Sequence, residues 1–400
     1  MLRKNCNFIN LLICFMCISI LIDCINGYLI FNDVGYSISR LYRCILLILI
    51  YSYLFIKLKI LIILNTVFAI IFYMIYFTAI NIKLEYMDWL IKFIIIVVSY
   101  ELGKILIKNG KKKSILKIIK ISFFILLINF MLGFFGFGFS MYGTSIGTSG
   151  FIFAGNEIGV LVVILGTILL MHHITNNNFK MFFIILFCMF FMSAMLTSKV
   201  SILATIIIGY FFVSIRFFDS IKNNKIDKKI FSYTLLMCTV ISILLPCVLY
   251  YVLFEQNLLS RLLYFYNRID LVTLFFSHRN IWAYDSAMIY INNYSFIEKI
   301  FGSGFGANSS NIKEIVEIDV VDFLMYYGFF GVIIVFIFLM LVFLKTNKYN
   351  PLRYYLFVSY FLIILISLTA GHVFNSGVSG LYLGLLFSFS NIRKGKTCLK

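Results

Sequence analysis

The sequence has little charge and very little acid. Only 12% of its 400 residues are charged, and 16 acidic residues face 34 lysines and arginines. Hydrophobic residues make up 62% of the chain and recur in long runs. A soluble core cannot bury that much apolar surface, whereas a bilayer accepts it at roughly 20 residues per helical span. The composition therefore predicts an all-α, polytopic integral membrane protein.

Signatures of soluble catalysts and metal sites are also missing. The chain has no H-E-x-x-H and no Walker loop. Its nine cysteines are scattered, mostly within apolar runs, and the C-x-x-C of Cys14 and Cys17 has no second pair. Metal and disulfide frameworks need paired ligands at regular spacing. We therefore expect no metal, no cofactor and no disulfide.

The positive charge lies between the apolar runs rather than in one basic domain. The strongest cluster is the "KNGKKKS" stretch at 108–114. Lysine and arginine are enriched in the cytoplasmic loops of membrane proteins, so this pattern indicates topology and not nucleic-acid binding. It puts the 108–113 run and both chain termini in the cytoplasm.

The apolar runs predict about twelve transmembrane helices in a single membrane domain over residues 1–400. The 133–150 segment is rich in Gly, Ser and Thr, so it is either a flexible connection or a close-packed re-entrant one. The spans are expected at 8–30, 39–56, 60–80, 89–107, 118–137, 151–171, 181–196, 200–216, 231–253, 322–344, 354–370 and 377–391.

One large external loop, 254–320, separates the ninth and tenth spans. It is the only long segment that is not mostly hydrocarbon side chains, and residues 254–322 hold 8 of the 16 acidic residues. A basic membrane protein with one polar, slightly acidic excursion suggests that the spans hold a site and that this loop covers it.

Ionisable side chains gather at the external ends of the predicted spans. Charge within a membrane is costly and is usually paired or functional. Guanidinium and ammonium groups suit a pyrophosphate, and a carboxylate shielded from water can become basic enough to deprotonate a sugar hydroxyl. Mutual pairing that only holds helices together is the open alternative. These residues are Arg40, Arg43, Glu157, Lys199, Arg279, Glu317, Asp319, Asp322 and His372.

Five short patches carry a resemblance to a known family. They are "GNEIG" (with Asn156 and Glu157), "LTSKVS" (Ser198 and Lys199), "SHRNIW" (Arg279 and Trp282), "EIDVVDFLMYYGFFG" (ending in Gly328 and Gly331) and "AGHVFNSG". In order, spacing and side of the membrane they resemble the O-antigen and capsule repeat-unit polymerases, relatives of the O-antigen ligases. Two departures from the family's patches stand out: His278 replaces the usual Gly, and Lys199 stands in place of Arg.

The resemblance implies a metal-independent, inverting glycosyltransferase in the bacterial cytoplasmic (inner) membrane. It would transfer a growing glycan from polyprenyl pyrophosphate to a lipid-linked repeat unit at the outer face. The implied partners are the polyprenyl-pyrophosphate-linked oligosaccharide, membrane lipids and a chain-length regulator protein, with no nucleic acid.

The resemblance also suggests roles for the external charges. Arg279, Lys199, Arg40 and Arg43 would bind pyrophosphate. Glu317 would be the base, because it occupies the position where ligases tend to carry His. Asp319 and Asp322 would orient it or hold the cations, and the further candidates are Asn156, Glu157 and His372. An acidic helix start satisfied by its own dipole is the alternative for the three acids.

Three other functions stay open. A flippase or exporter of lipid-linked oligosaccharide would share the substrate and the basic cavity, but such transporters usually show an internal repeat, which this chain lacks. An O-antigen ligase would share the resemblance. A metal-dependent transferase needs paired acids in the first external loop, where Asp33 has no acidic neighbour.

Overall fold

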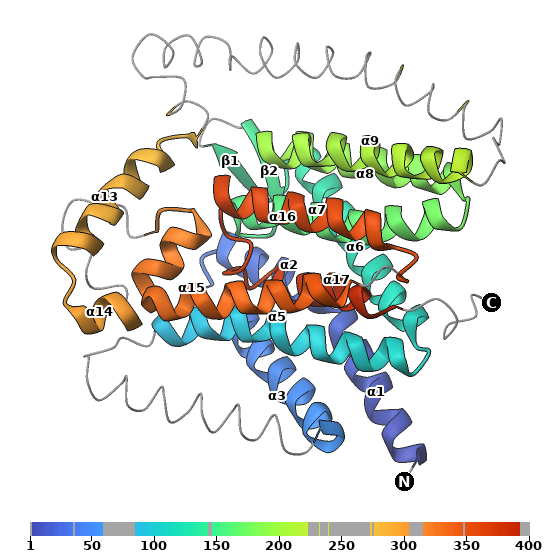
Figure 1. The fold of residues 1–400 in the computed structure, drawn as a ribbon. Coiled ribbons are helices and arrows are strands. Elements are labelled where there is room, and N and C mark those ends of the chain that lie inside the picture. Colours follow the sequence, from blue (N-terminus) through green and yellow to red (C-terminus); the bar gives the residue numbers. More distant parts are fainter. Residues whose placement is uncertain are drawn as a thin grey trace.

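The computed structural model describes residues 2–34, 37–58, 85–142, 146–222, 276–303, 315–346 and 349–392, with Ser232, Thr239 and Thr273. This part of the chain is predominantly helical, as expected (Figure 1). Its helices are α1 Leu2–Cys17, α2 Ser19–Phe31, α3 Ile38–Leu58, α5 Glu85–Lys108, α6 Lys112–Phe134, α7 Gly155–Thr175, α8 Phe179–Met195, α9 Lys199–Lys222, α13 Arg279–Asn292, α14 Phe296–Phe301, α15 Asp319–Lys345, α16 Arg353–Thr369 and α17 Gly380–Ser388.

Several of these helices can cross a membrane. Within the described residues, five are long and apolar enough by length and composition. A sixth span results if α1 and α2, which meet at a 43° bend, are counted as one. Two further apolar helices, α8 and α16, are shorter. The five are Ile38–Phe55, Lys112–Phe134, Gly155–Thr175, Lys199–Lys222 and Asp319–Lys345.

The predicted spans match these helices closely in position. Span 60–80 lies outside the described residues, as do span 231–253 apart from Ser232 and Thr239 and, in the 254–320 loop, residues 254–272, 274–275 and 304–314. The last predicted span, 377–391, differs from the expectation. Its helix α17 has nine residues and continues only into a 3-10 turn, Phe389–Asn391. At 1.5 Å per residue α17 rises about 14 Å, roughly half the hydrocarbon thickness of a bilayer.

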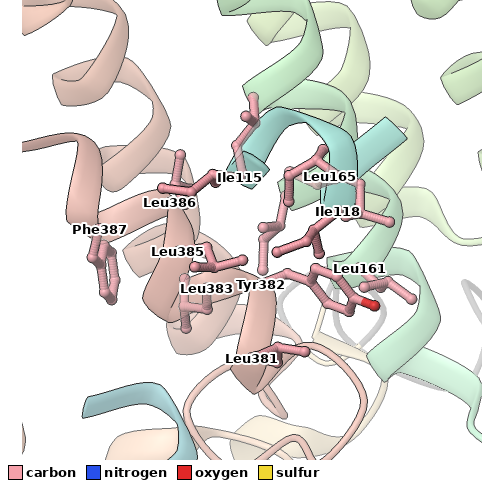
Figure 2. Close-up of a cluster of buried hydrophobic side chains, with 14 of the residues drawn as sticks. Ile115, Ile118, Leu161, Leu165, Leu381, Tyr382, Leu383, Leu385, Leu386 and Phe387 are labelled. Carbon is pink, nitrogen blue, oxygen red and sulfur yellow. The ribbon is translucent and has the colours of Figure 1, made fainter. Parts of the chain in front are cut away.

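Helix α7 forms the centre of the bundle. It is apolar on every side, and nearly all its residues from Ile158 to Ile174 are buried. A helix that is hydrophobic all round lies either in a protein core or in lipid, and the burial of α7 places it in the core. Its neighbours include α6, α8, α9 and α17. Figure 2 shows Leu161 and Leu165 of α7 beside Tyr382 of α17, whose hydroxyl lies 2.8 Å from Ser122 Oγ on α6.

Small residues bring α17 unusually close to α5. A Cβ on Gly384 would lie 2.3 Å from the carbonyl oxygen of Ile96, and one on Gly103 would lie 2.4 Å from Ser388 Oγ. Gly380 and Gly384 form a G-x-x-x-G repeat on α17. Such spacing allows two helix backbones to approach closely. The contact between α5 and α17 is therefore made by backbone atoms rather than by interlocking side chains.

We expect Gly384→Ala to lower the thermal unfolding midpoint of the purified protein in detergent. Alanine improves helix propensity by about 1 kcal/mol, but here its methyl overlaps backbone atoms of α5 and forces the helices apart, at about 1–3 kcal/mol. Gly155→Ala is the matched control, because its Cβ would meet only Met141 Cε at 3.4 Å. Equal midpoints for Gly384→Ala and wild type would contradict the close contact.

The described parts of the Gly-rich segment after α6 form two paired strands, so they are not a flexible connection. Strands β1, Phe139–Tyr142, and β2, Ile146–Gly150, pair antiparallel. Asn129 of α6 anchors the hairpin, since its Nδ2 donates to Ser149 O (2.8 Å) and its Oδ1 accepts from Phe151 N (2.8 Å). This two-stranded sheet is the departure from a purely helical fold in the described residues.

Basic residues and the predicted site residues lie at opposite ends of the bundle. Basic residues lie at the end of α5, the start of α6 and the end of α9, on the right of Figure 1. The β-hairpin and α13 lie on the left. The helix starts with Asn156, Arg279 and Asp319 therefore share the end that carries fewer lysines.

Candidate functional site

The carboxylate of Glu317 is the meeting point of three distant segments. Its Oε2 accepts from Arg279 Nη2 (2.6 Å) and Nε (3.2 Å), and from Asn156 Nδ2 (3.0 Å). The Arg279 and Glu317 side chains are only 14% and 18% exposed. This ion pair is largely withdrawn from water, so it is not a surface pair of negligible strength.

Asp322 accepts hydrogen bonds from the backbone at and just before Glu317. Its Oδ1 accepts from Val316 N (2.8 Å), and its Oδ2 accepts from Glu317 N (3.2 Å). Glu317 itself has φ 65°, a left-handed conformation that is rare for a residue with a Cβ. Residues in such conformations persist only where the surroundings hold them, and they cluster at functional sites.

Asp319 connects the start of α15 to the α16–α17 loop. The side chain is buried, and its Oδ2 accepts from Val373 N (3.0 Å) and Phe374 N (3.2 Å). The same loop presses on Glu317, because a Cβ at Gly371 would lie 2.4 Å from the carbonyl carbon and oxygen of Glu317. Gly371 also has φ 61°, so two requirements call for glycine here.

The α13–α14 hairpin carries Arg279, and a pair of glycines attaches that hairpin to α15. Helix α15 is interrupted at Gly328 (φ 63°), and a Cβ there would lie 2.4 Å from Ile300 O. A Cβ at Gly302 (φ 85°) would in turn lie 2.2 Å from Tyr326 O. The interruption exposes backbone carbonyls, and Ser303 N donates to one of them, Met325 O, at 3.3 Å.

The residue before Arg279 has an unusual backbone. His278, the N-cap residue of α13, has φ 68°, a left-handed conformation that favours glycine. The surroundings therefore hold a strained residue directly before Arg279.

A second ion pair lies beside the loop between α16 and α17. Arg43 Nη2 of α3 is 2.7 Å from Asp23 Oδ1 of α2, with side chains 17% and 6% exposed. The guanidinium lies against Gly377, where a Cβ would be 2.6 Å from Nη1. The next residue back, Ser376, donates its hydroxyl to Glu157 Oε2 at 2.6 Å. The α16–α17 loop thus contacts Glu317, Asp319, Arg43 and Glu157.

His372 occupies the same loop between α16 and α17. Burial lowers the pKa of His372 below its ordinary value. The carboxylates of Glu157 and Glu317 oppose that shift, while Lys92 and Arg279 add to it. At neutral pH the imidazole is therefore neutral, so it can accept a proton or a hydrogen bond from a ligand.

We expect His372→Asn to flatten the pH dependence of stability. The folded-state pKa of His372 lies below the unfolded value of about 6.5, so protonation favours the unfolded chain as the pH falls below that value. Between about pH 7.5 and about pH 5.5 the unfolding midpoint of the wild type should therefore fall relative to that of the variant. Asn tolerates the left-handed backbone of His372 (φ 57°). An identical pH dependence of the unfolding midpoint in both proteins would refute this.

The interactions above join eight of the ten predicted site residues. Arg40 and Lys199 have exposed side chains, and the contacts above do not involve them. Asp319 and Asp322 accept hydrogen bonds from backbone N–H groups. Those in the cluster are Arg43, Asn156, Glu157, Arg279, Glu317, Asp319, Asp322 and His372.

Sequence reasoning missed four members of the cluster: Asp23, Gly371, Ser376 and Gly377. An acid inside the first predicted span was the available signal for Asp23, because a lone intramembrane charge needs a partner. Gly371, Ser376 and Gly377 lie in the "AGHVFNSG" patch, but the sequence gave these three residues no individual role.

No group of three His, Cys, Asp or Glu side chains within the described ranges is arranged to hold a metal ion. The cluster instead offers two guanidinium groups, several carboxylates and one neutral imidazole, which can bind a phosphate-bearing ligand and move a proton. Comparison with protein-family models, curated proteins and solved structures finds no match to this chain.

Proposed function

We propose that this chain is a polysaccharide repeat-unit polymerase of the O-antigen and capsule type. A hydroxyl oxygen of the lipid-linked repeat unit attacks the anomeric carbon of the growing glycan. The bond from that carbon to the pyrophosphate oxygen breaks with inversion, and polyprenyl pyrophosphate departs. The hydroxyl proton passes to a base of the protein.

One observation carries this proposal: three of the patches that resemble the polymerases converge on a single carboxylate oxygen. "GNEIG" supplies Asn156, "SHRNIW" supplies Arg279, and Glu317 accepts from both. These residues are 161 and 38 positions from Glu317. Chance resemblance in short patches gives no reason for their side chains to meet.

The ion pair suggests how substrate binding could switch the base on. A pyrophosphate competes with Glu317 for the Arg279 guanidinium, since both anions use the same N–H groups. A carboxylate that loses its cation becomes a stronger base. Donor binding would then free Glu317 to take the proton of the acceptor hydroxyl, so that proton transfer follows arrival of the donor.

The decisive experiment supplies purified protein in lipid vesicles with a lipid-linked repeat unit alone. A polymerase converts it into a ladder of longer lipid-linked glycans without nucleotide sugar or added metal. An exporter or flippase leaves every glycan at one repeat unit, which would refute the proposal. A ligase also leaves one repeat unit until a lipid A-type acceptor is added, so that second reaction separates it from a polymerase.

The proposal includes twelve spans, cytoplasmic termini and an external 254–320 loop. We expect Asn293→Cys, on the exposed α13–α14 turn, to react with an impermeant thiol reagent added to intact spheroplasts. Asn109→Cys, beside the 108–113 lysine run, should react only after the membrane is opened. The unsubstituted chain controls for native cysteines. Labelling of Asn109→Cys alone in intact cells would invert the topology.

A further inference from the structure

Helix α13 has its apolar face pointing away from the protein. The exposed hydrophobic side chains are Ile281, Tyr284, Met288 and Ile291, spaced three, four and three residues apart along one face. Tyr284 is 64% exposed and Ile291 is 58% exposed. The stripe continues into α14, where Phe296 is 77% exposed.

The less exposed face of α13 mixes polar side chains with the half-buried apolar side chains of Trp282, Ala283 and Ile289. Arg279 points to Glu317, Ser286 is fully buried, and Tyr290 donates its hydroxyl to Lys299 O at 2.6 Å. A helix that covers a protein in water has a polar outward face, whereas the outward face of α13 is apolar. The medium that α13 faces is therefore apolar.

The neighbouring surface indicates which apolar medium this is. Helix α14 packs on α15, one of the helices able to span a membrane, at the Gly302–Gly328 contact. Beyond that contact α15 has its own exposed apolar side chains, including Phe329, Phe336 and Leu344. The stripe on α13 and α14 thus continues the surface by which α15 would face lipid.

The direction of α13 agrees with a helix at the membrane surface. It runs steeply across the left-hand ends of helices that lie roughly horizontally in Figure 1. The exposed polar residues Asn292 and Asn293 lie at its C-terminal end. Interfacial helices have this form, with an apolar face sunk about 5–10 Å into the acyl boundary and polar groups at headgroup level.

We propose that the α13–α14 hairpin is a membrane-interface element whose Ile281–Ile291 stripe lies among the acyl chains of the bilayer. Arg279, at the first turn of α13, is thereby held at the level of lipid headgroups. The surface does not depend on glycosyl transfer. Only the identity of the headgroup that reaches Arg279, a polyprenyl pyrophosphate, rests on the proposed function.

Depth-dependent quenching tests the surface directly. Tyr284→Cys and Met288→Cys are labelled with an environment-sensitive fluorophore in full-length protein, one copy per nanodisc, in phosphatidylethanolamine and phosphatidylglycerol without polyprenyl lipid. Asn293→Cys is the matched control on the same hairpin, and the unsubstituted chain gives the background. Spin-labelled acyl chains should quench the two stripe positions several-fold more than Asn293→Cys, and aqueous iodide should do the opposite.

Two outcomes would overturn the proposal. Strong iodide quenching at Tyr284→Cys and Met288→Cys would put the stripe in water. Protection from both quenchers would mean that protein covers it. Neither outcome bears on polymerisation, and a failed ladder assay would leave a lipid-quenched stripe in place, so the two proposals fail separately.

Discussion

Arg279→Lys should abolish most chain extension, nearly as completely as Arg279→Ala. In the structure the guanidinium uses two N–H groups on one carboxylate oxygen of Glu317, at 2.6 and 3.2 Å. A lysine keeps the charge but loses the planar fork that could exchange this carboxylate for a pyrophosphate. Because such donors act on charge that develops in the transition state, we expect a loss of roughly 100-fold or more. Ladder formation from lipid-linked repeat units measures it.

Arg216→Lys provides the matched control for this substitution. Arg216 lies on α9 towards the opposite end of the bundle, and its Nη2 donates to Asn177 Oδ1 at 2.5 Å. The same chemical change there should leave polymerisation near wild type. Size-exclusion profiles of both variants would establish that each is folded. Normal ladders from folded Arg279→Lys would rule out a bidentate role for the guanidinium.

Glu317→Gln should reduce chain extension by orders of magnitude while the protein still folds and binds donor lipid. The amide is nearly isosteric, and its oxygen can still accept from Arg279 and Asn156, so the local geometry survives. It cannot take a proton from the acceptor hydroxyl, which removes general-base catalysis worth roughly 100- to 10,000-fold. Rates at saturating donor, together with donor affinity, separate this from a binding defect.

Glu298→Gln makes the same change at a nearby glutamate outside the cluster. Glu298 caps α14 by accepting from Ser295 N at 2.7 Å, and this substitution should cost only a little stability. Near wild-type extension by purified Glu317→Gln would remove Glu317 as the base. His372 and Glu157 would then be the next residues to test, because Asp319 and Asp322 are committed to backbone N–H groups.

The sequence by itself determined the helical, apolar character of this protein and where most of its helices lie. Runs such as 118–137 and 200–216 are long enough to call for a helix whatever their neighbours, because an unpaired backbone cannot lie in hydrocarbon. Charge spacing also placed Asn156, Arg279 and Glu317 at one end of the helices, since each follows or precedes an apolar run. These properties are local, so the order of residues along the chain carries them.

Only the tertiary structure decided which of those charges meet. Arg43 pairs with Asp23 and lies on Gly377, whereas Arg40, three residues earlier, has an exposed side chain. The same is true of the Gly-rich hairpin held by Asn129, the short helix α17, and the apolar stripe that points outward from α13. Each depends on the distance between segments far apart in sequence. The packing of helix backbones sets that distance, as at Gly384, where an added Cβ would lie 2.3 Å from Ile96 O.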